Sequence, residues 1–179
     1  MPTIDVIRTY LQMESLSELQ STAPAPEPSR VEQATRCPAS FYRYLYAEVG
    51  HNYHWVDRLG WTDHEITEHL GRPDVTLWVM YASGSPAGYF ELERHEDGST
   101  EIAYFGLLPE FIGRGLGGHL LTLAVRQAWS TGAGRVWLHT CTLDDAAAMP
   151  NYLKRGFKPF KQETYSAVVP GSQVAATDE

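Results

Sequence analysis

The chain has 179 residues, 22 acidic and 14 basic side chains, and a formal net charge of −8 at pH 7. This length suits one domain with its own core. The negative charge repels phosphate and argues against a nucleic-acid surface. Only two cysteines, Cys37 and Cys141, are present, far apart and without metal-ligand spacing, so we expect no disulfide framework and a reducing, cytoplasmic setting. No apolar run reaches the roughly 20 residues of a membrane helix, and the charged first 20 residues do not resemble a signal peptide.

The N-terminal part of the chain predicts one strand, a linker and two helices. Residues 3–13 are rich in Ile, Val, Thr and Tyr and indicate a strand. Residues 21–29 are rich in Ala and Pro, which favour a linker or loop. Aromatic and apolar side chains recur at helical spacing over 41–49, and a short helix is expected over 63–70.

The remainder predicts an antiparallel meander followed by alternating helices and strands. Residues 83–86 and Asp97-Gly98 are turn signals between the meander strands. The most regular apolar stripe predicts a helix over 116–131, which Gly132 and Gly134 end. The expected strands are 75–82, 87–95, 100–108, 135–141, 157–160 and 164–169, with a further helix over 145–155.

This order of elements predicts a mixed α/β sheet covered by helices. Residues 1–36 are expected to contribute the N-terminal strand and linker to a domain whose main part is 37–170. Residues 171–179 are expected to form a flexible tail.

A glycine-rich turn, Gly113-Arg114-Gly115-Leu116-Gly117-Gly118, links a predicted strand to the most regular helix. Converging backbone N–H groups and the positive end of a helix make such a turn an anion site, although glycines also simply permit tight turns. The dinucleotide fingerprint is disfavoured because a hairpin, and no parallel βαβ unit, precedes the turn. A nucleotide P-loop is excluded because no Gly-Lys-Ser/Thr triplet follows.

Two stretches together resemble the GNAT superfamily of N-acetyltransferases. Residues 107–117 (LLPEFIGRGLG) are similar to its pyrophosphate motif, and residues 148–157 (AMPNYLKRGF) to its second motif. The resemblance implies a GNAT fold, a mostly antiparallel twisted sheet whose fourth and fifth predicted strands splay apart to admit the pantetheine arm, with a bulge at Gly106. It also implies acetyl-CoA as co-substrate. The residues expected to bind it are Leu107, Gly113, Arg114, Gly115, Leu116, Gly117 and Gly118.

Two positions depart from the family pattern. Ile112 stands where the family has Arg or Gln, which removes one side-chain contact to the pyrophosphate but leaves the backbone N–H groups and Arg114. Asp145, preceded by Asp144, stands where Asn often heads the second motif. Their negative charge opposes the coenzyme phosphates if they lie close.

Direct acetyl transfer to an amine requires a base, polarisation of the thioester carbonyl and a proton for the thiolate. The resemblance assigns the base to Glu101 and the general acid to Tyr152, and backbone N–H groups near Leu107 would polarise the carbonyl. Glu91, Glu93 and His139 are rival bases. Cys141 as nucleophile is disfavoured because no base is identifiable beside it.

An aromatic cluster provides the hypothesis for the acceptor site. The first two helices usually wall the acceptor in the family, so Tyr53, Trp55 and Trp61 are expected to shape its pocket. His64 and His69 are five apart instead of four, so no zinc site is expected there, and no metal elsewhere.

The expected partner is a small-molecule or peptide amine, with a slight preference for a cationic one, and no membrane or nucleic acid. A homodimer is compatible with the resemblance. A non-catalytic acyl-CoA-binding module of the same fold is the alternative function. A dinucleotide-dependent oxidoreductase is a third class, which the absence of a βαβ unit disfavours.

Overall fold

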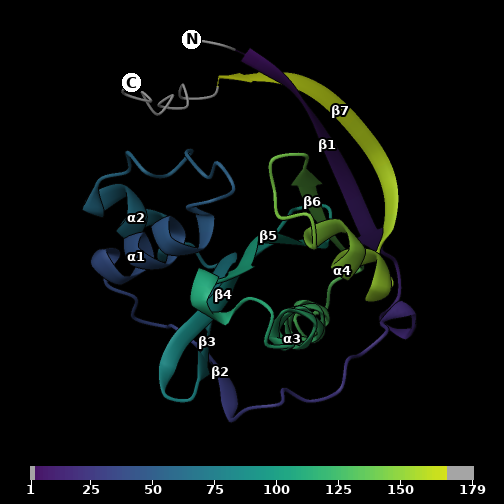
Figure 1. Ribbon diagram of the computed structural model, residues 1–179, viewed down its shortest axis with the longest axis horizontal. Coiled ribbons are helices and arrows are strands. Elements are labelled where there is room, and N and C mark those ends of the chain that lie inside the picture. The colour runs from purple at the N-terminus through teal and green to yellow at the C-terminus, as the bar shows by residue number, and fades with distance from the viewer. Residues whose placement is uncertain (1–2, 169–179) are drawn as a thin grey trace, which may run out of the picture.

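The computed structural model describes residues 3–168, which form one seven-stranded sheet with α1 and α2 on one face and α3 and α4 on the other (Figure 1). The strand order is β2-β3-β4-β5-β6-β1-β7. Every neighbouring pair is antiparallel except β5 and β6. The predicted mixed, mostly antiparallel sheet with flanking helices is therefore confirmed. The predicted tail, 171–179, and residue 169 lie outside the described residues.

Most predicted elements are present at the predicted places. The strands are β1 (Thr3–Met13), β2 (Ser29–Gln33), β3 (Val75–Ala82), β4 (Ser85–Arg94), β5 (Ser99–Leu107), β6 (Arg135–Cys141) and β7 (Lys158–Val168). The helices are η1 (Leu16–Glu18), α1 (Ala39–Gly50), α2 (Asp63–Leu70), η2 (Pro109–Phe111), α3 (Leu116–Ser130) and α4 (Ala148–Lys154).

The end of the predicted linker and the expected turn at 83–86 differ from the structure. Strand β2 begins inside the predicted linker, and its mainly exposed residues carry no clear alternation. The hairpin between β3 and β4 turns on Ser83 and Gly84 alone, both with positive φ. Pro86 lies within β4 at a shift of register opposite Tyr81, and such an irregularity accommodates a residue without an N–H donor.

The C-terminal elements also differ from the prediction. Strand β7 is continuous where two strands were predicted, because β1 pairs with it along almost its whole length. Helix α4 begins three residues later than predicted. Asp145 Oδ1 accepts a hydrogen bond from the Ala147 N–H at 2.7 Å, and this local turn holds the chain outside the helix.

Strand β1 lies between β6 and β7, a position that its own sequence does not reveal. Arg8 to Met13 pair with β6, while Thr3 to Gln12 pair with β7, beginning with Thr3 opposite Val168. The residues before Arg8 therefore pair with β7 alone and extend with it as the long curved ribbon in Figure 1. The two ends of the described chain form one ladder.

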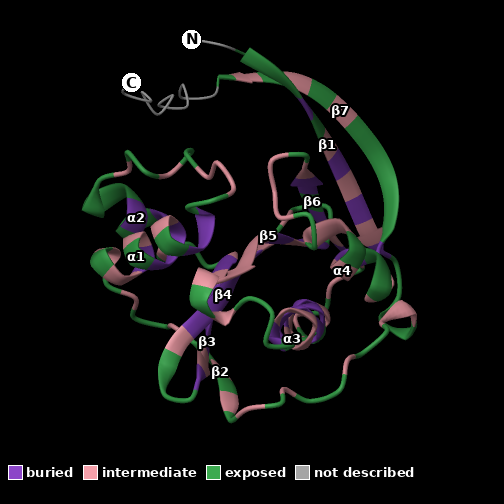
Figure 2. Ribbon diagram, viewed as in Figure 1, coloured by how far each residue is buried: buried purple, intermediate pink, exposed green. Residues whose placement is uncertain are grey.

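The two faces of the sheet have separate cores, visible as the buried stretches in Figure 2. On one face, Leu120, Ala124 and Ala128 of the apolar stripe predicted for α3 pack against the sheet. Leu121 joins them in the core, whereas Leu123, which the stripe also included, does not. On the other, Tyr42, Leu45 and the rest of the α1 face cover β3 and β4. Both faces of β4 are therefore buried, which explains its run of buried residues.

Strands β5 and β6 diverge soon after they meet. Their parallel pairing covers only Ser99 to Glu101 opposite Arg135 to Trp137. The expected splaying of the fourth and fifth predicted strands is thus observed. The expected bulge at Gly106 is wrong, because the register shifts opposite Glu91/Leu92, between Ile102 and Tyr104. Gly106 is needed for another reason: a β-carbon there would lie 2.5 Å from Val49 Cγ1 of α1.

Over residues 3–168, none of the helices combines the length and apolar character that spanning a bilayer requires.

Candidate active site

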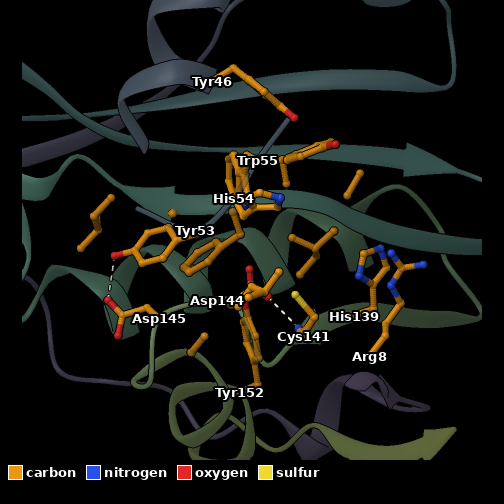
Figure 3. Close-up of a pocket in the computed structure, with 18 of the residues that line it drawn as sticks. Arg8, Tyr46, Tyr53, His54, Trp55, His139, Cys141, Asp144, Asp145 and Tyr152 are labelled. Carbon is orange, nitrogen blue, oxygen red and sulfur yellow. Dashed lines mark hydrogen bonds between the residues drawn. The ribbon is translucent and has the colours of Figure 1, made fainter. Parts of the chain in front are cut away.

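A cleft of about 880 Å³ opens where β5 and β6 diverge. Its walls come from β5, β6, the start of α3, α4, the segment between α1 and α2, and the β1–β7 ribbon. Figure 3 shows side chains from these elements converging on one space, with Tyr152 on one side and Tyr46 and Trp55 on the other.

The glycine-rich turn forms one end of the cleft. Gly113 and Gly115 have φ of 82° and 74°, a region that L side chains rarely adopt. Gly115 is the N-cap of α3 and offers no side-chain cap, so the first N–H groups of the helix are left for another acceptor. This geometry fits a pyrophosphate.

Only part of the expected coenzyme set lines the cleft: Leu107, Gly113, Gly117 and Gly118. Leu116 is wholly buried in the core beneath the turn. The Arg114 guanidinium lies 4.8 Å from the centre of the Phe111 ring and 3.7 Å from Glu27. The positive charge of Arg114 is thus paired with Glu27, which lies in the linker before β2.

A second cation near the turn is Arg155, which the sequence reading did not single out. Its Nε and Nη1 are buried and have no hydrogen-bond partner within residues 3–168. Nη1 would lie 3.0 Å from a β-carbon at Gly118. Arg155 does not itself line the cleft, but two of its nitrogens without an acceptor would be satisfied by an anion beside the turn, such as a phosphate group. The only sequence signal was its place just before Gly156 in the second motif.

Glu101 lies where β5 and β6 separate and lines the cleft with a side chain only 13% exposed. His95 Nε2 is 2.9 Å from Glu101 Oε2, and His139 Nε2 is 4.0 Å from Oε1. Burial raises the pKa of Glu101 above its usual range, and the hydrogen bond from His95 offsets this only in part. A carboxylate with a raised pKa is better suited to accept a proton near neutral pH.

The two rival carboxylates have other partners. Glu91 is wholly buried, and its carboxylate is bound by Arg58 at 2.8 Å and His69 at 2.7 Å. It does not line the cleft. Glu93 does, but Arg72 Nη2 lies 2.7 Å from its Oε1.

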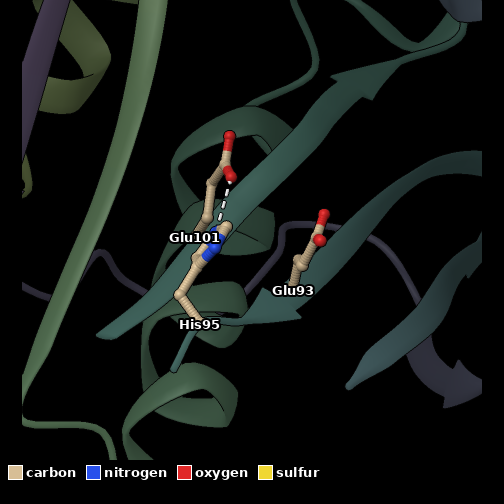
Figure 4. Close-up of side chains that lie close together, drawn as sticks. All are labelled: Glu93, His95 and Glu101. Atoms are coloured by element: carbon tan, nitrogen blue, oxygen red, sulfur yellow. Dashed lines mark hydrogen bonds and ion pairs between the residues drawn. The ribbon is translucent and has the colours of Figure 1, made fainter. Parts of the chain in front are cut away.

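Glu93, His95 and Glu101 form a compact cluster, shown in Figure 4. One possible ligand atom from each lies within 4.8 Å of the others. Two of the three already share a hydrogen bond and the third an ion pair with Arg72, so these interactions account for the cluster.

Tyr152 faces the cleft from α4. It is 7% exposed, and its ring packs edge-on against Phe105 with centroids 6.2 Å apart. Burial, and then the charge of Asp144, raises the pKa of Tyr152, so its phenol is protonated at neutral pH. Cys141 also lines the cleft, where its N–H donates to Asp144.

The segment between α1 and α2 covers the cleft. The Tyr53 phenol donates to Asp145 Oδ2 at 2.8 Å, and His54 Nε2 lies 3.1 Å from the Val168 carbonyl oxygen. Burial and the Asp145 contact raise the pKa of Tyr53 to about 12. The segment therefore bridges the β6–α4 loop and the end of β7.

The three aromatic residues expected at the acceptor site are not all brought together. Tyr53 and Trp55 line the cleft, while Trp61 does not. Trp61 instead packs on the Arg58 guanidinium, 4.7 Å from its ring centre, and against His69. Trp61 therefore packs against the buried Arg58–Glu91 pair and does not contact the cleft.

Two curated proteins similar to this chain are both mycothiol acetyltransferases. The chain is 31% identical over 121 residues to a mycothiol acetyltransferase from Mycolicibacterium gilvum, a match covering 62% of this chain and 40% of that protein. It is 28% identical over 109 residues to a mycothiol acetyltransferase from Corynebacterium efficiens, covering 59% and 36%. The match thus spans well under half the length of these curated relatives.

Solved structures show the same fold. A GCN5-related N-acetyltransferase from Kribbella flavida superposes with a TM-score of 0.64 at 21% identity, over 97% of this chain and 62% of that one. One from Sphaerobacter thermophilus gives 0.62 at 16% identity, over 93% and 52%. The profile of the Acetyltransferase (GNAT) family matches residues 35–157, which contain both motifs and most of the cleft. The chain belongs to the GNAT family of acetyltransferases.

Proposed function

We propose that this protein transfers the acetyl group of acetyl-CoA directly to the primary amine of a small molecule or peptide. The observation that carries the proposal is one cleft lined both by Glu101, a carboxylate only 13% exposed at the fork of the strands, and by the buried phenol of Tyr152 from α4. Family membership supports an acyl-CoA as the co-substrate. The glycine turn and Arg155 provide N–H groups and charge suited to its phosphates.

Glu101 acts as the base in this proposal. An ammonium group is not nucleophilic, so one proton must leave the amine, either directly to the Glu101 carboxylate or through a water molecule. Because the pKa of Glu101 is raised, its carboxylate is a stronger base and accepts a proton from the amine more readily. His95, hydrogen-bonded to Oε2, fixes the carboxylate in position.

Tyr152 supplies the proton for the leaving sulfur. The amine nitrogen forms a bond to the acetyl carbon, the carbon–sulfur bond breaks, and the thiolate takes the phenol proton of Tyr152. A phenol whose pKa is raised by burial stays protonated until a strongly basic group forms beside it. Backbone N–H groups near Leu107 polarise the thioester carbonyl.

Tyr53 and Trp55 wall the acceptor in this proposal. Both belong to the segment that joins α1 and α2 and line the cleft from there, so they would contact a molecule entering from that side. Trp61 acts indirectly, by packing on Arg58.

The test is acceptor-dependent release of the coenzyme A thiol over a broad panel of amines. Glu101→Gln and Tyr152→Phe are each expected to lower kcat by about 10²- to 10⁴-fold, the usual size of general acid–base catalysis. Glu68→Gln and Tyr44→Phe make the same chemical changes at exposed positions and should leave kcat unchanged. Acetyl-CoA binding without thiol release for any amine would refute the transferase and favour a non-catalytic binding module.

A further inference from the structure

Arg8 enters the cleft from the inserted strand β1. It is the first β1 residue paired with β6, opposite Cys141, and the residues before it pair with β7 alone. Arg8 lines the cleft together with His139 of the neighbouring strand. In Figure 3 the guanidinium and the imidazole extend in the same direction from the cleft wall.

The charge of Arg8 has no counterion within residues 3–168. Its Nε is buried without a hydrogen-bond partner, and no carboxylate of the described chain forms an ion pair with it. Glu163 lies opposite Arg8 on β7, but it accepts from the Tyr10 phenol at 2.8 Å and pairs with Lys161 at 2.5 Å. Arg58, the other arginine lining the cleft, is neutralised by Glu91.

The Arg8 side chain is also held in place. Its guanidinium lies over the Tyr165 ring, 4.8 Å from the ring centre. A planar cation fixed by stacking loses less freedom when it binds a ligand, and its paired N–H groups match the two oxygens of a carboxylate.

His139 and Glu101 are polar side chains of the cleft that lie in the same part of it as Arg8. Burial, and next the charge of Arg8, lowers the pKa of His139, so its imidazole is neutral near pH 7. His139 Nε2 lies 4.0 Å from Glu101 Oε1. One unneutralised cation and one carboxylate thus flank a neutral imidazole in the same part of the cleft.

We propose that Arg8 binds the carboxylate of a free amino acid whose amine is presented to Glu101. The inference rests on the proposed acetyl transfer and narrows its acceptor to molecules that carry an amine and a carboxylate together. A carboxylate supplies the acceptor that the Arg8 Nε–H lacks within residues 3–168, and the ammonium group of the same molecule is attracted to Glu101 before it loses its proton.

The experiment compares amino acids with their carboxamides. Thiol release is measured for glycine, L-phenylalanine and β-alanine, and for the matching amides, with wild type, Arg8→Gln and Arg8→Lys. Arg30→Gln, at an exposed position, is the control. Wild type should prefer at least one acid over its amide. Arg8→Gln should raise KM for that acid by about 10- to 100-fold, with kcat and amide turnover nearly unchanged, as expected for a charge-assisted pair.

Arg8→Lys should recover part of the lost affinity, because it restores the charge but not the two-pronged geometry. Equal use of acids and amides by wild type, or an equal loss on both in Arg8→Gln, would overturn the role of Arg8 while leaving acetyl transfer intact. If acetyl-CoA binds but no amine or amino acid gives thiol release, the proposed function fails as well. Thermal unfolding of each variant separates loss of binding from loss of fold.

Discussion

The buried ion pair between Arg58 and Glu91 provides a sharp test of the interactions that hold the cleft wall. Arg58 belongs to the segment between α1 and α2, and its guanidinium lies 4.7 Å from the centre of the Trp61 ring and 4.4 Å from that of the Tyr104 ring. Glu91 is on β4 and wholly buried. We predict that Arg58→Met strongly destabilises the protein, because it keeps most of the packing volume but leaves Glu91 without its main countercharge.

The expected loss follows from burial. Removing one partner of a buried pair typically costs about 3–5 kcal/mol. His69 and Tyr42 still hydrogen-bond to Glu91, which favours the lower end of that range. For a domain of this size, about 3 kcal/mol corresponds to a fall in Tm of roughly 6–12 °C.

Urea unfolding followed by tryptophan fluorescence measures the loss, with two further variants. Arg30→Met breaks an exposed pair, in which Arg30 and Glu32 are 58% and 57% exposed, and should cost no more than about 1 kcal/mol. The double variant Arg58→Met/Glu91→Gln should recover about 1–3 kcal/mol relative to Arg58→Met, because a buried neutral amide is cheaper than an unpaired charge. A loss in Arg58→Met no larger than in Arg30→Met would refute this reasoning.

The effect should also depend on pH. Burial raises the pKa of Glu91, but the His69 hydrogen bond and the Arg58 charge lower it more, so its folded pKa lies below the usual range. Its stabilisation is therefore present above the unfolded pKa of about 4.3 and is lost as pH falls through the lower folded value. Without Arg58 the folded pKa should rise, so the deficit of Arg58→Met should shrink on acidification below about pH 5.

Two further predictions concern the cleft and its support. Because burial raises the pKa of Glu101, the acid limb of kcat/KM should have a midpoint above about 4.3 in wild type and be absent in the residual activity of Glu101→Gln, as a pH–rate profile would reveal. In Gly106→Ala the new β-carbon would lie 2.5 Å from Val49, so unfolding free energy should fall by about 1–3 kcal/mol, whereas Gly60→Ala, with nothing within 4 Å, should change it little. Equal stability of these two alanine variants would contradict the packing argument.

Local sequence patterns predicted where helices and strands occur along the chain better than they predicted which elements lie next to one another in the fold. The helix over 116–131 and the strand over 75–82 were predicted from residues close in sequence, and α3 and β3 lie at those places. The position of β1 depends on pairing with β6 and β7, whose residues lie more than 120 positions away in the sequence. Residues 3–13 would suit other partner strands equally well, so their sequence alone does not predict this position.

In the candidate site, too, the residue types could be predicted from the sequence, whereas their partners could not. Glu91, Glu93 and Glu101 are all strand glutamates and look alike in sequence, but Arg58, Arg72 and His95 give each a different environment. Likewise Arg114, inside the glycine motif, is paired with Glu27, while Nε and Nη1 of Arg155, near Gly118, have no hydrogen-bond partner within residues 3–168. Such differences arise from tertiary contacts between distant segments and have no local signature.

The ladder between β1 and β7 determines how the molecule would respond to force. Because the strands are antiparallel and Thr3 pairs with Val168, both ends of the described chain leave the sheet at the same end of one ladder. Tension applied between them would load the hydrogen bonds one pair at a time, as in opening a zipper, and not all together in shear. The outermost pairs would part first, and the opening would then advance toward Arg8 and the wall of the cleft.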